Sequence, residues 1–123
     1  MKKVLYALLL SFVLFGCAKT TEGEKCVTIE VVYGDEGIDK SYDYCTDQEY
    51  LLGLLDEQSE ELEVEKTNYD FGPMVSGLKG FNFESLGLKY YWSIYVNGEY
   101  GMLGISDQPV TDGDVYKFEA TSF

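Results

Sequence analysis

The sequence feature that most constrains the fold is a pair of alternating segments on either side of a glycine-rich turn. Apolar and polar residues alternate over positions 27–31, which is typical of a strand with one buried face. Residues 40–45 alternate as well, and the turn-forming residues 34–37 lie between the two segments. An antiparallel register that starts with Cys26 opposite Cys45 places apolar residues opposite apolar ones and polar residues opposite polar ones. The sequence therefore predicts a β-hairpin with one cysteine on each strand.

The N-terminus has the order of an export signal. Lys2 and Lys3 precede an apolar run over residues 4–15 that only Ser11 interrupts. About a dozen apolar residues are too few to span a bilayer, which needs about 20 residues in a helix. The alternative, a buried amphipathic helix, fits this order less well. We therefore expect residues 1–16 to be a signal peptide that is removed.

The residues that follow resemble the lipobox of bacterial lipoproteins, in which a signal peptidase cuts before a diacylated cysteine. Residues 14–17 read Leu-Phe-Gly-Cys, with a small glycine directly before Cys17. The resemblance implies that Cys17 is the lipidated first residue of the mature chain, with residues 17–25 as a short polar tether. Residues 26–123 then form one domain with one core. Two acyl chains give lasting attachment, so we expect a lipid-anchored protein on the extracytoplasmic face of the cell membrane.

Once Cys17 is modified, two of the three cysteines remain, and in an oxidising compartment pairing is the default expectation. A Cys26–Cys45 disulfide would close the open end of the hairpin. A closed loop of about 20 residues contributes about 3 kcal/mol in the chain-entropy model. A redox-active pair is disfavoured because the sequence has no Cys-x-x-Cys spacing.

The charge balance excludes one class of partner. The chain has 22 acidic and 9 basic residues and a formal net charge of −13, which becomes more negative when Lys2 and Lys3 are removed. Such a charge repels phosphate backbones, so nucleic acid is not an expected partner. It also repels anionic headgroups, so attachment to the membrane is expected to depend on the acyl chains.

The central part of the chain predicts one helix followed by short strands. Residues 46–49 read Thr-Asp-Gln-Glu, a capping-box pattern, and leucines at helical spacing follow up to Gln58. The glutamate-rich residues 59–65 are interpreted as a solvated helix end rather than a metal site, with an edge strand over 62–66. Residues 69–87 contain glycines and a proline between apolar residues, which indicates short strands and tight turns.

The C-terminal third gives the strongest strand signal. Residues 89–96 alternate and end at Asn97–Gly98, a two-residue hairpin turn. We expect residues 99–103 to return antiparallel. A second turn at 112–114 should precede the closing strand, residues 115–121.

These segments resemble a known family. Tyr91–Gly98 reads Tyr-Trp-Ser-Ile-Tyr-Val-Asn-Gly, and Asp112–Val115 reads Asp-Gly-Asp-Val. Both are similar to the transcobalamin C-terminal-like domain of bacterial surface lipoproteins, in which an aromatic strand ends in Asn-Gly and a Gly-Asp turn precedes the final strand. With the order hairpin, crossover helix and further hairpins, the expected fold class is α+β, a β-grasp-like mixed sheet with one crossover helix. In the vitamin carriers of this family, the domain caps cobalamin held mainly against a separate helical domain, so the resemblance implies a weak corrinoid site or one shared with a partner.

The sequence argues against an enzyme. It contains no histidine, the remaining thiols are expected to be oxidised, and the carboxylates are scattered over turns. We therefore expect no catalytic residue and no required cofactor. A cobalamin-type molecule remains a possible ligand.

The candidate binding residues surround the turn at 97–98. Tyr91 and Tyr95 project from the strand face opposite the core, and Tyr100 is expected to join them across the turn. Tyrosine offers apolar area and a hydroxyl group at low entropic cost. We therefore nominate Tyr91, Tyr95, Asn97 and Tyr100 as ligand-binding residues. The alternative is that the tyrosines are covered sheet residues and that Asn97 serves the turn.

Three functions remain open. The first is a membrane-anchored extracytoplasmic module that binds a corrinoid or another small ligand, alone or with a surface or transporter protein. The second is a surface interaction or adhesion module. The third is a calcium-binding lipoprotein, although neither residues 35–39 nor 112–114 match a calcium-loop pattern, and no metal-ligating residue is nominated.

Overall fold

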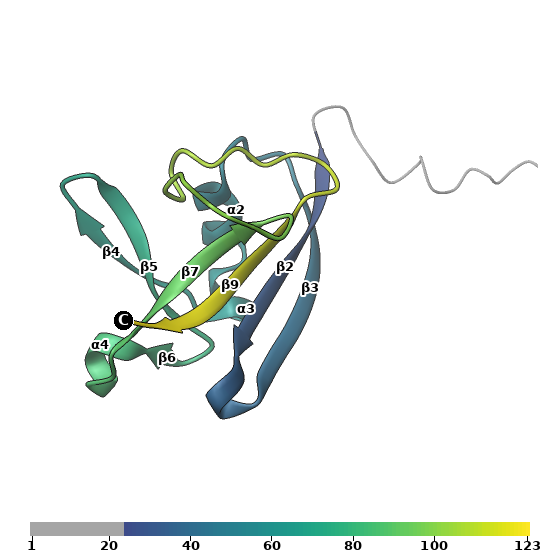
Figure 1. The fold of residues 1–123 in the computed structure, drawn as a ribbon. Coiled ribbons are helices and arrows are strands. Elements are labelled where there is room, and N and C mark those ends of the chain that lie inside the picture. Colours follow the sequence, from purple (N-terminus) through teal and green to yellow (C-terminus); the bar gives the residue numbers. More distant parts are fainter. Residues whose placement is uncertain (1–23) are drawn as a thin grey trace, which may run out of the picture.

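A computed structural model of the protein describes residues 24–123. The expected signal peptide (residues 1–16), the lipidation site Cys17 and most of the tether lie outside these residues. The described part is a mixed α+β fold, as the sequence predicts, with a five-stranded mixed sheet, a smaller three-stranded sheet and short helices (Figure 1). The strands are β2 (Lys25–Tyr33), β3 (Ile38–Thr46), β4 (Glu65–Tyr69), β5 (Gly72–Leu78), β6 (Phe81–Asn82), β7 (Tyr90–Val96), β8 (Glu99–Tyr100) and β9 (Val115–Ser122). The helices are α2 (Leu51–Glu57), α3 (Ser59–Leu62) and α4 (Phe83–Leu86), with a short 3-10 turn, η2 (Gly34–Glu36), between β2 and β3.

The first hairpin has the predicted register. Strands β2 and β3 pair antiparallel with Cys26 opposite Cys45 and with Val27 opposite Tyr44. Gly37 closes the turn with a φ of 69°, a left-handed conformation that glycine adopts without a steric cost. The hairpin prediction is confirmed.

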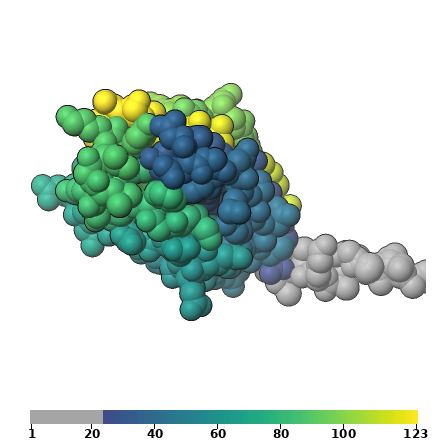
Figure 2. Space-filling model, turned by 90° about the horizontal axis from the view of Figure 1, so that it is seen from below, coloured from purple at the N-terminus to yellow at the C-terminus, as the bar shows by residue number. Residues whose placement is uncertain are grey.

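The large sheet has the order β3-β2-β9-β7-β8. Strand β9 lies parallel to β2, with Ile29 beside Tyr116 and Val31 beside Phe118, whereas its other neighbour, β7, runs antiparallel. In Figure 2 the C-terminal residues lie next to the tip of the β2–β3 hairpin. The first and the last described strands are therefore neighbours at the centre of the sheet.

The core lies between one face of this sheet and the helices. Alternate residues of β2 are buried, and Tyr116 and Phe118 of β9 are fully buried beside them. The leucines of α2 and α3 cover this face, and each buried side chain of this size contributes about 1.5–3 kcal/mol. Among the described residues, the fully buried core side chains are Ile29, Val31, Leu51, Leu54, Leu55, Leu62, Leu78, Ile105, Tyr116 and Phe118.

The helical segment differs from the prediction. The capping box at residues 46–49 is wrong, because α2 begins after Tyr50, which has extended backbone and no side-chain cap. Thr46 belongs to β3, where its hydroxyl donates to Glu57 Oε1 at 2.7 Å and accepts from the N–H of Gln48 at 3.0 Å. Two short helices, α2 and α3, follow the hairpin in place of one, and α4 comes later in the chain.

Two predicted strands are shifted or shortened. The edge strand expected at 62–66 is β4, which begins at Glu65 because Leu62 is the buried end of α3. The return strand expected at 99–103 is the two-residue β8. A Cβ on Gly101 would lie 3.2 Å from the carbonyl oxygen of Ile94, so the chain passes close to β7 there before it turns away.

Candidate functional site

The structure brings three of the four nominated residues together. One face of the sheet carries Tyr91, Tyr95 and Tyr100. Tyr91 and Tyr95 share this face because they are four positions apart on β7, and Tyr100 shares it because it is paired with Tyr95 across the hairpin. The rings of Tyr95 and Tyr100 meet edge to face, with their centroids 5.7 Å apart. Hydrogen bonding to Tyr100, followed by desolvation, raises the pKa of Tyr91 above its usual value. We call these three residues the tyrosine cluster.

The tyrosine cluster lies on the sheet face opposite the helices. Trp92, on the other face, is 4% exposed and donates from Nε1 to the carbonyl oxygen of Phe81 at 3.0 Å. Its ring packs against Phe83, with centroids 5.0 Å apart. Helix α4 and the segment around Phe81 therefore cover the Trp92 face, and Tyr100 keeps 54% of its surface exposed.

A lysine adds a positive charge beside the cluster. The Nζ of Lys117 on β9 lies 4.9 Å from the ring centroid of Tyr95, within the range of a cation–π contact. The same amine lies 3.5 Å from Glu119. The tyrosine face thus combines aromatic surface with a partly neutralised cation.

Asn97 is committed to the turn and to the strand that follows. Its backbone has a φ of 53°, and its side chain accepts from the N–H of Val115 and donates to Asp114 Oδ1, each at 2.9 Å. Both polar atoms of the amide are therefore used within the domain. The structure places Asn97 near the cluster, but in a structural position.

Two adjoining hollows run between β5 and β7, with volumes of about 370 and 230 Å³. Both are lined by Tyr91 and Trp92 from β7 and by Met74 and Val75 from β5. We call the two hollows together the aromatic groove. The smaller hollow also reaches Tyr100, so the groove is continuous with part of the tyrosine cluster.

The rim of the groove is apolar and exposed. Phe71 is 73% exposed and Met102 is 86% exposed, and both line the smaller hollow together with Leu103. Exposed apolar side chains that gather in one place indicate an interaction surface. Sequence reasoning missed these residues because Phe71 lies in a turn, and because Met102 and Leu103 were expected in a strand over 99–103 that in the structure ends at Tyr100. The signal that the sequence carried is that these large apolar residues stand next to glycines that favour turns.

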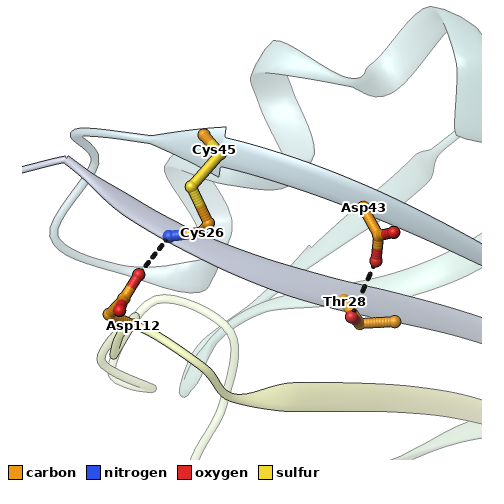
Figure 3. The surroundings of a disulfide bond; sticks show 5 residues. All are labelled: Cys26, Thr28, Asp43, Cys45 and Asp112. Atoms are coloured by element: carbon orange, nitrogen blue, oxygen red, sulfur yellow. Dashed lines mark hydrogen bonds between the residues drawn. A yellow bond between two sulfur atoms is a disulfide. The ribbon is translucent and has the colours of Figure 1, made fainter. Parts of the chain in front are cut away.

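The disulfide predicted from the hairpin is present at the β3–β2 edge of the sheet, across from the β7–β8 edge. Cys26 and Cys45 are joined, and the N–H of Cys26 donates to Asp112 Oδ1 at 2.7 Å (Figure 3). Thr28 donates to Asp43 across the same hairpin at 2.8 Å (Figure 3). The disulfide indicates an oxidising, extracytoplasmic location.

Two kinds of feature are absent from residues 24–123. In this range no helix has both the length and the apolar character that crossing a bilayer requires. Nor does this part of the chain bring three or more cysteine, aspartate or glutamate side chains together in an arrangement that could hold a metal ion.

One protein family matches the chain. Residues 52–122 match the domain of unknown function DUF4430. The match covers more than half of the sequence, and the chain belongs to this family. No curated protein matches the chain.

Solved structures with the same fold give two points of comparison. A protein from Ruminococcus gnavus ATCC 29149, provisionally described as metal-binding, has a TM-score of 0.69 at 24% identity over 80% of this chain and 98% of its own. Haptocorrin in complex with Cbi has a TM-score of 0.68 at 12% identity over 85% of this chain. This chain spans 26% of the haptocorrin chain. The predicted resemblance to the transcobalamin C-terminal-like domain is confirmed at the level of the fold.

Proposed function

We propose that the protein is a lipid-anchored extracytoplasmic binding module whose aromatic groove holds one edge of a flat, amphipathic small ligand of the corrinoid class. The observation that carries the proposal is the meeting of the groove with the tyrosine cluster. There the aromatic residues Tyr91, Trp92 and Tyr100 line the same hollow as the exposed apolar residues Phe71 and Met102. Small-molecule sites have this composition of apolar walls with a few polar groups.

The groove suits partial rather than complete enclosure of such a ligand. Its larger hollow, about 370 Å³, is near the lower end of the range for small-molecule sites. The fold likeness to haptocorrin in complex with Cbi supports the corrinoid class. Because this chain spans only 26% of the haptocorrin chain, we propose that a second protein, such as a surface or transporter protein, completes the site. We therefore expect weak binding by this domain alone.

The proposal includes the fold type and the absence of catalysis. A hairpin, a helical crossover and a last strand parallel to the first support a β-grasp assignment. The absence of histidine from the sequence supports a binding rather than a catalytic role. Lipidation of Cys17 is the proposed means of attachment.

Titration of the mature protein with cobinamide and cobalamin tests the ligand class. The chain has a single tryptophan, Trp92, and it lines the groove, so its fluorescence reports occupancy there. We expect saturable quenching, together with a shift of the visible corrinoid spectrum.

A variant tests the position of the site. Tyr100→Ala should weaken binding about tenfold, which corresponds to about 1.4 kcal/mol. The control Tyr50→Ala removes a tyrosine that is also exposed but lines neither hollow, and it should bind as the unmodified protein does. Flat titrations with both corrinoids would refute the proposed ligand class.

A surface interaction module is the second candidate. It is favoured by the exposed side chains of Phe71, Met102 and Leu103, which form the rim of the groove. In this case, a membrane protein should co-purify with the native chain and be lost from a Phe71→Ser, Met102→Ser variant. Unchanged recovery of that protein would count against this candidate.

A further inference from the structure

Strand β7 has one open edge. It pairs with β9 along its whole length, but with β8 only at Tyr95 and Val96. The N–H of Gly101 donates to the carbonyl oxygen of Ile94 at 2.7 Å, and beyond this bond the chain turns away. From Tyr90 to Ser93, therefore, this edge has no strand partner among residues 24–123.

The open edge carries main-chain groups that have no hydrogen-bond partner among residues 24–123. Along a strand in an antiparallel pair, the N–H and C=O groups of successive residues point alternately to the two edges. Since the carbonyl of Ile94 points to the β8 side, the N–H and C=O of Trp92, two residues earlier, point to the same side. An edge of this kind is a ready template for another strand.

The aromatic groove provides space beside this edge. Trp92 and Tyr91 line both hollows, and the opposite wall is β5, which belongs to the separate three-stranded sheet. In Figure 1 the β4–β5 hairpin projects away from β7 rather than lying flat against it. The alternating side chains of an added strand would thus find apolar contacts with Met74 and Val75.

Charge indicates which kind of strand fits. The chain has a formal net charge of −13, Glu84 lines the larger hollow, and Glu99 lines a further hollow that shares Tyr100 and Met102 with the smaller one. A second copy of this acidic chain would be repelled, whereas a basic segment would be attracted. We infer that the open edge of β7 accepts an extended, basic peptide segment of another protein as an added strand. This goes beyond small-ligand binding and predicts that the two occupants compete for the groove.

Amide hydrogen exchange tests strand addition directly. The probe is a capped eight-residue peptide of alternating lysine and valine, added at millimolar concentration to the ¹⁵N-labelled mature protein. We expect exchange of the Trp92 amide, which points to the open edge, to slow about tenfold, because a new main-chain hydrogen bond protects it. The Tyr91 amide points to β9 and should be unaffected. The control peptide carries N-methyl groups on two adjacent central residues, which removes a donor from each of its edges, and it should give no protection.

Variants of the groove wall test the charge argument. Met74 is 38% exposed, so Met74→Lys and Met74→Glu are matched changes at a site that does not depend on deep burial. The lysine variant should bind the basic peptide about tenfold more weakly, and the glutamate variant at least as tightly as the unmodified protein. Because recognition runs through the main chain, unchanged exchange at Trp92, or equal protection by the N-methylated peptide, would overturn the inference. Cobinamide binding without peptide protection would overturn this inference and leave the small-ligand proposal standing. Peptide protection without cobinamide binding would support this inference and refute the small-ligand proposal.

Discussion

Asn97 connects the β7–β8 turn to the start of β9. Its positive φ suits the first position of a tight hairpin turn, where asparagine and glycine are favoured. Its side chain holds Asp114 and Val115 in place, and its backbone N–H donates to the Val115 carbonyl at 2.8 Å. A residue nominated for ligand binding thus has a role in closing the sheet.

Substitution of Asn97 should therefore affect stability more than binding. Asn97→Ala removes two side-chain hydrogen bonds and strains the turn, so we expect the free energy of unfolding to fall by about 1–3 kcal/mol. Urea denaturation followed by tryptophan fluorescence measures this loss. Asn97→Gly tolerates the positive φ and should lose less. If Asn97→Gly remains folded but binds cobinamide much more weakly than the unmodified protein, the structural role is insufficient and the residue contacts ligand.

Tyr116 limits the stability of the folded protein at alkaline pH. Burial raises the pKa of its hydroxyl above the usual value of about 10, with Asp114 acting in the same direction and the N–H of Thr111 in the opposite one. Below pH 10 the folded and unfolded states both keep the proton, so the stabilisation is complete. Above pH 10 the unfolded chain releases the proton first, and the free energy of unfolding falls.

Tyr116→Phe should reduce this pH dependence. The variant loses the bond from the N–H of Thr111 at 3.1 Å and the contacts with Pro109 and Asp114, so we expect it to be about 1–3 kcal/mol less stable at neutral pH. Its denaturation midpoint should decline less steeply between pH 10 and 11 than that of the unmodified protein. Parallel declines in the two proteins would show that Tyr116 does not set the limit.

At the level of elements, the β2–β3 hairpin is held by its disulfide at the open end. The bond joins residues 19 positions apart, and the neighbouring loop is bonded to it through Asp112 and through Gly113, whose N–H donates to the Cys26 carbonyl at 2.8 Å. A Cys26→Ser, Cys45→Ser variant should lose about 3 kcal/mol of stability, chiefly because the unfolded chain gains freedom. Thermal unfolding measures the loss. The reductant dithiothreitol should lower the melting temperature of the unmodified protein towards that of the variant, and it should leave the variant unchanged.

The elements that the sequence predicted well are those whose signals are local. The β2–β3 register and the tyrosine cluster follow from a period of two residues, which assigns every side chain to a face once one is known. The capping box failed because Thr46 remains in β3 and its hydroxyl bonds to Glu57 instead of capping a helix. The groove was not predictable in this way. It depends on where the β4–β5 hairpin lies relative to β7, and no local pattern in either segment encodes that contact.

At the scale of the whole molecule, maturation remains the main prediction that the described residues do not reach. Mass spectrometry of the native protein should find a chain that begins at acylated Cys17, recovered with the membrane fraction. Cys17→Ala should leave residues 1–16 attached, because the peptidase requires the modified cysteine. Native protein with an intact Met1 and three free thiols would contradict the proposed anchoring.

The parallel pairing of β2 with β9 has a consequence for how the protein is made. A chain exported N-terminus first presents β2 early, yet the strand that fills the centre of the sheet, Val115–Ser122, follows more than 80 residues later. Contacts between such distant parts of a chain form late and slowly. On the proposed export route, the hairpin would lie outside the membrane with its apolar face uncovered until Val115–Ser122 have crossed. Closure of the cysteine pair would restrict its conformations during that interval.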